Sequence, residues 1–172
     1  VDVFEAPTVV NAGATASIDR FSAGRLAGVY RYKENGEPDN FTEGPAAGTN
    51  GLTGFTFAII GPRMQVAVDS SGGATNGNIY VAPGGAHHEV SVYAENGKPL
   101  TPLTKYKEGP TAGGTEEPFA GEVCGVAVGP SGAVYVGDRS GQVHKYQPVG
   151  GEPVVGDKTA NFEAPEVCNI AV

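Results

Sequence analysis

Hydrophobic residues along this chain fall in runs of three to five that are bounded by Gly, Pro, Asn or Asp. Such runs are typical of short β-strands, because the bounding residues favour turns. No stretch keeps the spacing of an amphipathic helix over three turns. The pattern therefore predicts an all-β chain with negligible helix.

The hydrophobic runs recur along the chain. The segment "GNIYVAP" at 77–83 aligns with "GAVYVGD" at 132–138, and each follows a "VAV" strand. Downstream of each lies a further predicted strand that ends in tyrosine. An earlier copy of this strand ends at residue 32. The aligned tyrosines are Tyr32, Tyr93 and Tyr146. The strand "EVCGVAV" also returns as "EVCNIAV" at the end of the chain. With repeat starts at phenylalanines, the alignment predicts repeats at 4–56, 57–118 and 119–161 and a stub at 162–172.

The turn residues between the hydrophobic runs predict four antiparallel strands in each repeat. Asn-Gly and Gly-Gly pairs suit tight hairpins, whose two central residues take positive φ. The pairs in question are Asn35-Gly36, Asn96-Gly97 and Gly150-Gly151. A four-stranded sheet cannot bury both faces alone, so we expect neighbouring sheets to stack face to face.

The order "VAV[DG]…G-x-[IV]-Y-V…V-x-x-Y…G" resembles the NHL repeat of six-bladed β-propellers. The resemblance covers residues 62–154, whereas the first repeat has "ASIDRF" where the Gly and Tyr of the motif would stand. It implies propeller blades of four antiparallel strands, here about three blades plus the first strand of a fourth. Propellers of this kind serve as sensors, scaffolds and ligand binders, and occasionally as lyases or hydrolases.

Three repeats fall short of the four or more blades that a propeller uses. We therefore expect these residues to form a partial propeller. Either further blades follow in a longer polypeptide, which we prefer, or a second chain completes the ring head to tail.

Composition and charge exclude some classes of binding partner. The 172 residues include 27 Gly and 13 Pro, and the formal net charge is −8. A nucleic-acid surface needs clustered Lys and Arg, so we expect no nucleic-acid partner. No hydrophobic run is long enough to cross a bilayer, and we expect no membrane span.

The two cysteines occupy matching places in successive repeats. Cys124 and Cys168 are 44 residues apart. Equivalent positions on neighbouring inner strands usually lie further apart than the roughly 4.4–6.8 Å between Cα atoms that a disulfide allows. We therefore expect two separate buried thiols, with a bridge as the alternative in an oxidising compartment.

Candidate chemistry is sparse. Adjacent His87 and His88 on an extended chain point to opposite sides, and the sequence has no HExxH spacing, so we expect no metal site and no cofactor. His144 is expected to be a half-exposed sheet residue. The oxygen-rich stretch 69–78 lacks the order of a calcium loop and predicts a long hairpin loop.

Ligand contacts are expected on loops, because loops vary freely on a rigid sheet scaffold. These are the loops at 21–28, 82–89 and 137–142 and the inter-blade connections near 43–54 and 107–121. The polar residues expected to make contacts are Arg25, His87, His88, Asp138 and Arg139. The repeated tyrosines could form a sugar-stacking surface, but packing between blades is the preferred interpretation.

Three functions fit these observations. The first, which we prefer, is a non-catalytic secreted or cell-surface propeller that binds a protein or glycan partner or builds an extracellular assembly. The second is a propeller lyase or hydrolase with catalytic groups partly outside this chain. The third is a purely structural module. No catalytic residue is assigned, because three scattered histidines build no catalytic arrangement.

Overall fold

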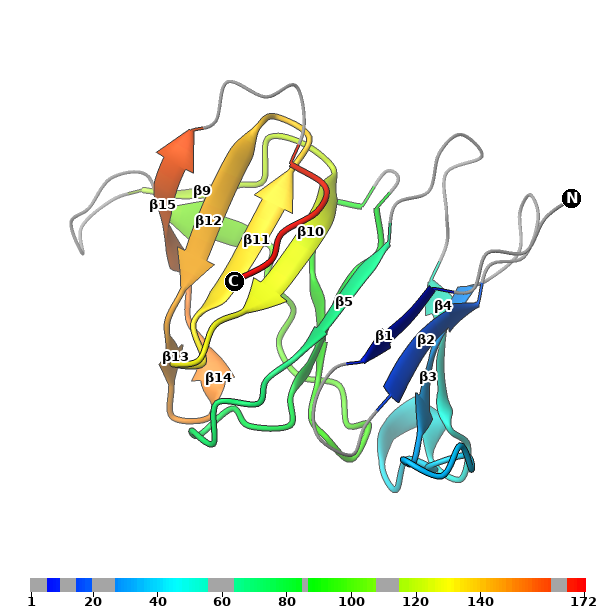
Figure 1. Cartoon of the computed structure of the whole chain (residues 1–172). Coiled ribbons are helices and arrows are strands. Elements are labelled where there is room, and N and C mark those ends of the chain that lie inside the picture. The colour runs from blue at the N-terminus through cyan, green and yellow to red at the C-terminus, as the bar shows by residue number, and fades with distance from the viewer. Residues whose placement is uncertain are drawn as a thin grey trace, which may run out of the picture.

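A computed structural model describes residues 6–9, 15–19, 27–55, 64–84, 87–107, 115–161 and 167–172. The chain is all-β, as the sequence predicts, with three larger sheets and one two-stranded hairpin in the described part (Figure 1). The single helical segment among these residues is the 3-10 turn η1 (Gly44–Ala46). No helix of the described residues has the length and hydropathy needed to cross a membrane.

The first sheet is an antiparallel meander in chain order, at the right of Figure 1. Its strands are β1 (Ala6–Val9), β2 (Thr15–Asp19), β3 (Ala27–Tyr32) and β4 (Gly51–Phe55). All four strands fall inside the predicted repeat 4–56. The segment "TASID" therefore forms a second strand without the Gly and Tyr that the later copies carry there.

The central and third sheets divide the remaining strands differently from the predicted repeats. The central sheet contains β5 (Gln65–Val68), β6 (Ile79–Ala82) and β7 (Ser91–Tyr93). The third sheet has the order β10-β11-β12-β15-β8-β9. Its strands are β10 (Val123–Val128), β11 (Val134–Asp138), β12 (Gln142–Tyr146), β15 (Gly156–Asn161), β8 (Lys105–Lys107) and β9 (Glu116–Pro118).

Strands β8 and β9 lie within the predicted repeat 57–118 but extend the third sheet. β8 pairs in parallel with β15, and the Tyr146 hydroxyl of β12 donates a hydrogen bond to the Lys105 carbonyl oxygen at 2.6 Å. The central sheet consequently has three strands in the described part rather than the four predicted for each repeat. The isolated bridge between Val90 and Leu103 continues its antiparallel pairing beyond β7.

The central sheet is buried on both faces because its side chains alternate between two hydrophobic clusters. Ile79 and Val81 pack with Leu52 and Phe55 of the first sheet. Tyr80 and Ala82, which point the other way along β6, pack with residues of the third sheet such as Val134, Val136 and Tyr146. All four residues of β6 are buried as a result. The three sheets are thus stacked face to face, as expected from the repeats.

Two kinds of turn join the strands. Gly150 and Gly151 both have positive φ and form the two-residue loop between β13 (Pro148–Val149) and β14 (Glu152–Pro153), as predicted. The Asn-Gly turns differ from the prediction. In the first, the Gly36 amide bonds the Lys33 carbonyl oxygen, so that Gly36 follows the two central residues instead of being one of them. The turn before Lys98 has the same pattern, with an Ala94–Gly97 bond. Both are longer hairpin connections with a positive-φ glycine at the end.

The prediction of separate thiols is wrong, because Cys124 and Cys168 form a disulfide with Cα atoms 4.6 Å apart. Two features bring them together. The register of β10 shifts between Val123 and Gly125, so Cys124 lies at an irregularity of the strand. Residues 167–172, here called the tail, form no strand and cross the third sheet instead of continuing as an equivalent inner strand (Figure 1).

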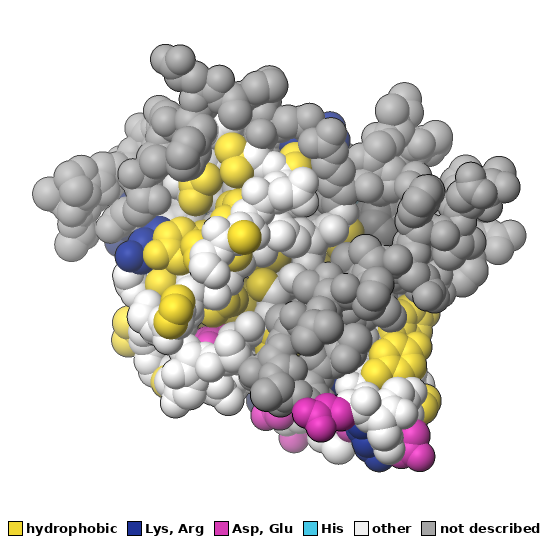
Figure 2. Space-filling model, viewed as in Figure 1, with side chains coloured by type: hydrophobic (Ala, Val, Ile, Leu, Met, Phe, Trp, Pro, Cys, Tyr) yellow, Lys and Arg dark blue, Asp and Glu magenta, His cyan; other side chains and the backbone are white. Residues whose placement is uncertain are grey.

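The tail lies against a pair of glycines. Gly125 of β10 is directly opposite Gly137 of β11, and a Cβ atom at either position would collide with the Val167 carbonyl oxygen. Gln65 of β5 also holds the tail, because its amide donates to the Ile170 carbonyl oxygen at 2.9 Å. Figure 2 shows hydrophobic side chains on this face of the third sheet. The absence of side chains at the two glycines is what lets the tail approach the backbone.

We expect Gly137→Ala to destabilise the protein by about 1–3 kcal/mol, because the new methyl group must displace the tail. Gly129→Ala is the matched control, since the nearest atom to its Cβ would be a Tyr135 ring carbon at 3.4 Å, an ordinary contact. Urea unfolding monitored by circular dichroism measures both. Equal midpoints for the two variants would contradict this account of the tail.

Candidate functional site

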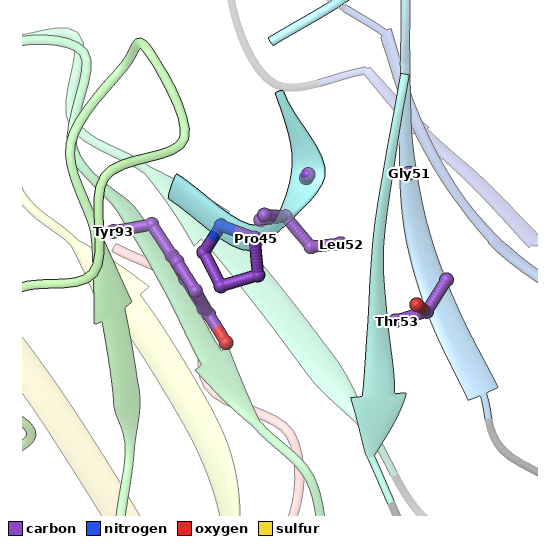
Figure 3. Close-up of a pocket in the computed structure, with 6 residues that line it drawn as sticks. Pro45, Gly51, Leu52, Thr53 and Tyr93 are labelled. Carbon is purple, nitrogen blue, oxygen red and sulfur yellow. The ribbon is translucent and has the colours of Figure 1, made fainter. Parts of the chain in front are cut away.

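The groove between the first and central sheets is the candidate binding site. It consists of two adjoining hollows that share Thr53 and Tyr93. The larger has a volume of about 160 Å³ and is lined by Thr53, Gly54, Phe55, Pro83, His87, Glu89, Ser91 and Tyr93. The smaller, of about 60 Å³, is lined by Pro45, Ala46, Gly51, Leu52, Thr53 and Tyr93. Figure 3 shows Tyr93 and Thr53 on opposite sides of the smaller hollow, with Pro45 and Leu52 between them.

Local structure fixes the walls of the groove. On one side, the η1 turn ends against β4, and Phe41 just before it is buried in the cluster between the two sheets. On the other side, the hairpin that carries Gly97 packs on the same segment, with the Thr42 amide bonded to the Asn96 carbonyl oxygen at 3.0 Å. The guanidinium of Arg31 lies over the Phe41 ring and forms an ion pair with Asp39 at 2.8 Å. The groove therefore lies between elements that are held by packing and hydrogen bonds.

Two aromatic rings and one carboxylate characterise the larger hollow. The rings of Phe55 and Tyr93 meet at 89° with centroids 6.4 Å apart. Burial raises the pKa of the Tyr93 hydroxyl, and the negative charge of Glu89 raises it further. Glu89 and Tyr93 both line this hollow. In the described part of the chain, no salt bridge is formed by Glu89.

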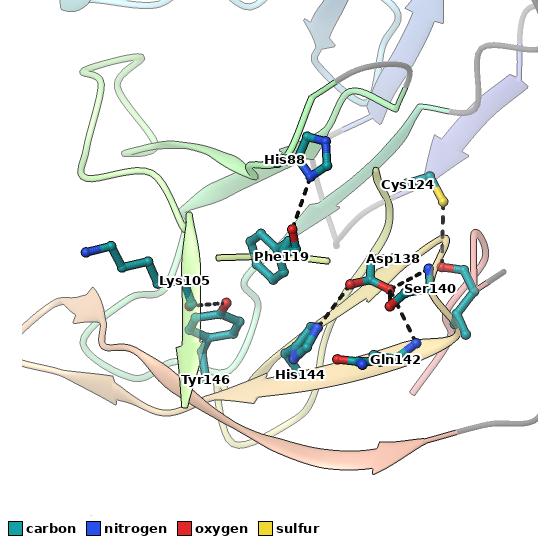
Figure 4. Close-up of polar contacts among 10 residues, drawn as sticks. His88, Lys105, Phe119, Cys124, Asp138, Ser140, Gln142, His144 and Tyr146 are labelled. Carbon is teal, nitrogen blue, oxygen red and sulfur yellow. Dashed lines mark hydrogen bonds and ion pairs between the residues drawn. The ribbon is translucent and has the colours of Figure 1, made fainter. Parts of the chain in front are cut away.

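The structure separates the two adjacent histidines, as their neighbouring positions predict. His87 lines the larger hollow. The exposed residue His88 points elsewhere, and its Nδ1 lies 3.1 Å from the Phe119 carbonyl oxygen (Figure 4). Because a carbonyl oxygen can only accept, Nδ1 of His88 carries the hydrogen. Of the predicted contact residues in the described part, His87 is the one that lines the groove.

Asp138 was predicted to make ligand contacts from a loop, and that prediction is wrong. Asp138 is the last residue of β11 and its side chain is 0 % exposed. One carboxylate oxygen accepts hydrogen bonds from the Ser140 amide at 2.9 Å and from the Ser140 hydroxyl. The other lies 3.3 Å from Nε2 of His144 (Figure 4). The carboxylate closes the β11–β12 turn and cannot contact a ligand.

His144 is fully buried, which corrects the expectation of a half-exposed residue. Its ring stacks on Tyr106 with centroids 4.1 Å apart and meets the edge of Phe119 at 5.1 Å. Nε2 donates to the Asp138 carboxylate, whereas Nδ1 has no hydrogen-bond partner among the described residues. A neutral ring protonated at Nε2 avoids a second buried N–H without an acceptor.

Burial and hydrogen bonds shift the pKa values of two side chains in this buried cluster, Asp138 and Tyr146. Burial alone would raise the pKa of the Asp138 carboxyl, but hydrogen bonds from His144, Ser140 and the Gln142 amide outweigh it and lower the pKa below its usual 3.8. Burial also raises the pKa of the Tyr146 hydroxyl well above its usual value. The cluster thus holds an ionised carboxylate and a neutral phenol at neutral pH.

Arg139, also predicted to make contacts, lines neither hollow of the groove. Arg139 is partly exposed and pairs with Glu122 at 2.8 Å. The backbone amide of Arg139 donates to the Glu122 carbonyl oxygen. The amide of Val123, which follows Glu122 in the chain, donates to the His87 carbonyl oxygen. Arg139 and His87 therefore flank one short segment at the same end of the sheets. Arg25 lies outside the described residues.

Sequence reasoning named the connections 43–54 and 82–89 but missed the individual residues that face each other across the groove. Tyr93 was interpreted as a packing residue, and Thr53 and Phe55 were not considered. Their positions depend on which strands of neighbouring sheets face each other, and the repeat pattern does not specify this. In the described part of the chain, no three His, Cys, Asp or Glu side chains are grouped as metal ligands. The stretch 69–78 is the β5–β6 loop, as predicted, with the Asp69 carboxylate bonded to the Ser71 amide and the Thr75 hydroxyl.

No protein-family model matches this chain, and a search of curated protein sequences finds no match either.

Proposed function

We propose that this chain is a non-catalytic binding module of a secreted or cell-surface protein, which holds a protein or glycan partner in the groove between β4 and β7. The observation that carries the proposal is the groove itself. It brings together the two predicted connections, 43–54 and 82–89, around the aromatic ring of Tyr93. Aromatic rings beside hydroxyl and carboxylate groups are common in binding sites for peptides and sugars.

The Cys124–Cys168 disulfide supports an extracellular location. Disulfides persist in oxidising compartments and are rare in the cytosol. The cysteines of this chain are both in the bridge, so neither is left as a free thiol.

The architecture that we propose for the module is a partial propeller similar to the NHL-repeat family. Three consecutive sheets stack face to face, and the first of them is a four-stranded meander in chain order. Further blades or a second chain would complete the ring, because a propeller uses at least four blades.

The alternative of a lyase or hydrolase has weaker support. The Asp138–His144 pair resembles the base-and-orienter part of a catalytic site, but both side chains are 0 % exposed. A general base must reach the proton that it removes, directly or through one water molecule. The pair is better explained as a structural element of the β11–β12 turn.

Thr53→Arg tests the proposed site, because Thr53 is exposed and lines both hollows. We expect binding to any partner found on glycan and extracellular-protein arrays to fall at least tenfold when the long cationic side chain fills the groove. Thr101→Arg is the matched control, since Thr101 is exposed and lines neither hollow. Partners that bind both variants equally well would show that the groove is not the binding site.

A further inference from the structure

We propose that the larger hollow of the groove binds an alkylated ammonium group, such as the headgroup of choline or a methylated lysine side chain. The inference rests on the proposed function, because it names the chemical group of the partner that enters this site. Three features of the hollow carry it: two aromatic side chains in its lining, a carboxylate that forms no salt bridge with the described residues, and a suitable size.

The aromatic walls come from opposite sheets. Phe55 ends β4 of the first sheet and Tyr93 ends β7 of the central sheet, and both line the hollow. Their planes are nearly perpendicular, at 89°, in an edge-to-face contact with centroids 6.4 Å apart. A cation is attracted to the face of an aromatic ring within about 6 Å of its centroid, and sites lined by several aromatic rings hold quaternary ammonium ligands.

Charge at the hollow favours a cation. Glu89 lines it and interacts electrostatically with Tyr93. No salt bridge of the described residues involves Glu89, and its side chain is partly buried. A partly desolvated carboxylate without a counter-ion gains more from a bound cation than an exposed one does. The whole chain, with a net charge of −8, also attracts cations over a longer range.

The size and the remaining lining select among cations. The volume of about 160 Å³ is below the roughly 300 Å³ at which drug-sized pockets begin, so a single small group fits. Pro83 adds an apolar surface, which suits methyl groups on nitrogen better than a fully hydrated ammonium. A neutral sugar ring could stack on Tyr93 but would leave the Glu89 charge uncompensated. These features favour an alkylated ammonium group over a sugar.

Choline and its neutral isostere 3,3-dimethyl-1-butanol separate charge from shape. We expect choline to bind in an NMR titration at pH 8, where histidine side chains are generally uncharged. The isostere should bind at least tenfold more weakly, because it fills the same space without a positive charge. Equal affinity for the two compounds, or no binding of choline at millimolar concentrations, would overturn the proposal.

Variants on the two sides of the hollow locate the site. Tyr93→Leu should weaken choline binding about tenfold, whereas Tyr93→Phe keeps the aromatic face and should bind within about twofold of the unmodified protein. Glu89→Gln tests the charge on a loop residue without changing the packed strands, and should weaken binding several-fold. Choline binding that is unchanged in Glu89→Gln would overturn the proposal even if Tyr93→Leu failed to fold.

The outcome is separable from that of the proposed function. If partner binding is lost in Thr53→Arg while choline shows no preference over its isostere, the groove is a binding site but not for an alkylated ammonium. If choline binding survives Thr53→Arg undiminished, the cation lies elsewhere and the inference fails. Binding of choline that is selective, and lost in Tyr93→Leu, Glu89→Gln and Thr53→Arg, would support the assignment.

Discussion

Asp138→Ala should lower the free energy of unfolding by about 3–5 kcal/mol, because it leaves several donors in a buried site without their acceptor at about 1–3 kcal/mol each. Four hydrogen bonds end on this carboxylate, from the Ser140 amide and hydroxyl, the Gln142 amide and the His144 ring. Without it, the buried His144 ring loses its partner at Nε2, and Nδ1 already has none in the described structure. Urea unfolding at pH 7 measures the loss.

The same substitution should change the acid dependence of stability. The pKa of Asp138 is lowered in the folded protein, so its carboxylate stabilises the fold at pH values above its ordinary pKa of 3.8. That stabilisation is lost as the pH falls through the lowered pKa of the folded state. The difference between the two proteins should therefore begin to shrink as the pH falls below about 4, where the unfolded chain takes up the proton first, and should be smallest below the lowered pKa of the folded state.

Glu34→Ala provides the control, because Glu34 is exposed in the β3–β4 connection. A surface substitution of this kind usually changes stability by less than about 0.5 kcal/mol. If Asp138→Ala behaved like Glu34→Ala, the carboxylate would not be the buried support of the turn that its contacts indicate.

Replacing both cysteines by alanine should cost about 4 kcal/mol. The bridge closes a loop between residues 44 positions apart, and the chain-entropy relation gives roughly this value for a loop of that length. The tail should then be held less firmly against Gly125 and Gly137, because its remaining hydrogen bonds are one from the Val167 amide to the Asp138 carbonyl oxygen and those with the partly buried Gln65 side chain. Thermal or urea unfolding of the double variant measures the loss.

Reduction of the unmodified protein is the matched comparison, because it opens the same bridge without changing the sequence. The reduced protein and the double variant should unfold at similar urea concentrations, and non-reduced mass spectrometry should show two fewer hydrogens than the dithiol. Identical stability before and after reduction would mean that the bridge does not restrain the tail.

Local sequence signals predicted the all-β character and the Gly-Gly hairpin, but not the geometry of the two Asn-Gly turns. Gly150-Gly151 forms its two-residue hairpin because both glycines take the positive φ that this turn requires. The "KYK" and "EEP" strands were missed as part of the third sheet because charged residues give little strand signal, and their pairing is set by the parallel contact with β15. Parallel neighbours come from distant segments, and hairpin signals do not reveal them.

Two errors at the buried cluster and the tail could have been avoided. His144 and Tyr146 are two residues apart on one strand, so a buried tyrosine implies that the histidine faces the same way. Glycines inside strands, here Gly125 and Gly137, often mark the close approach of another backbone segment. The walls of the groove could not be derived in this way, because they depend on how two sheets are placed against each other.

The doubly buried central sheet has a consequence for how the molecule unfolds. In a linear array of repeats, stability is a sum of terms for each member and for each contact between neighbours. The central sheet packs against the first sheet on one face and against the third sheet on the other. Its unfolding would therefore expose the hydrophobic faces of both neighbouring sheets at the same time. A perturbation at Tyr80 or Val81 therefore reaches the whole stack, whereas one confined to β3 weakens a single contact. The cooperativity of unfolding therefore depends most on the three-stranded central sheet, β5-β6-β7.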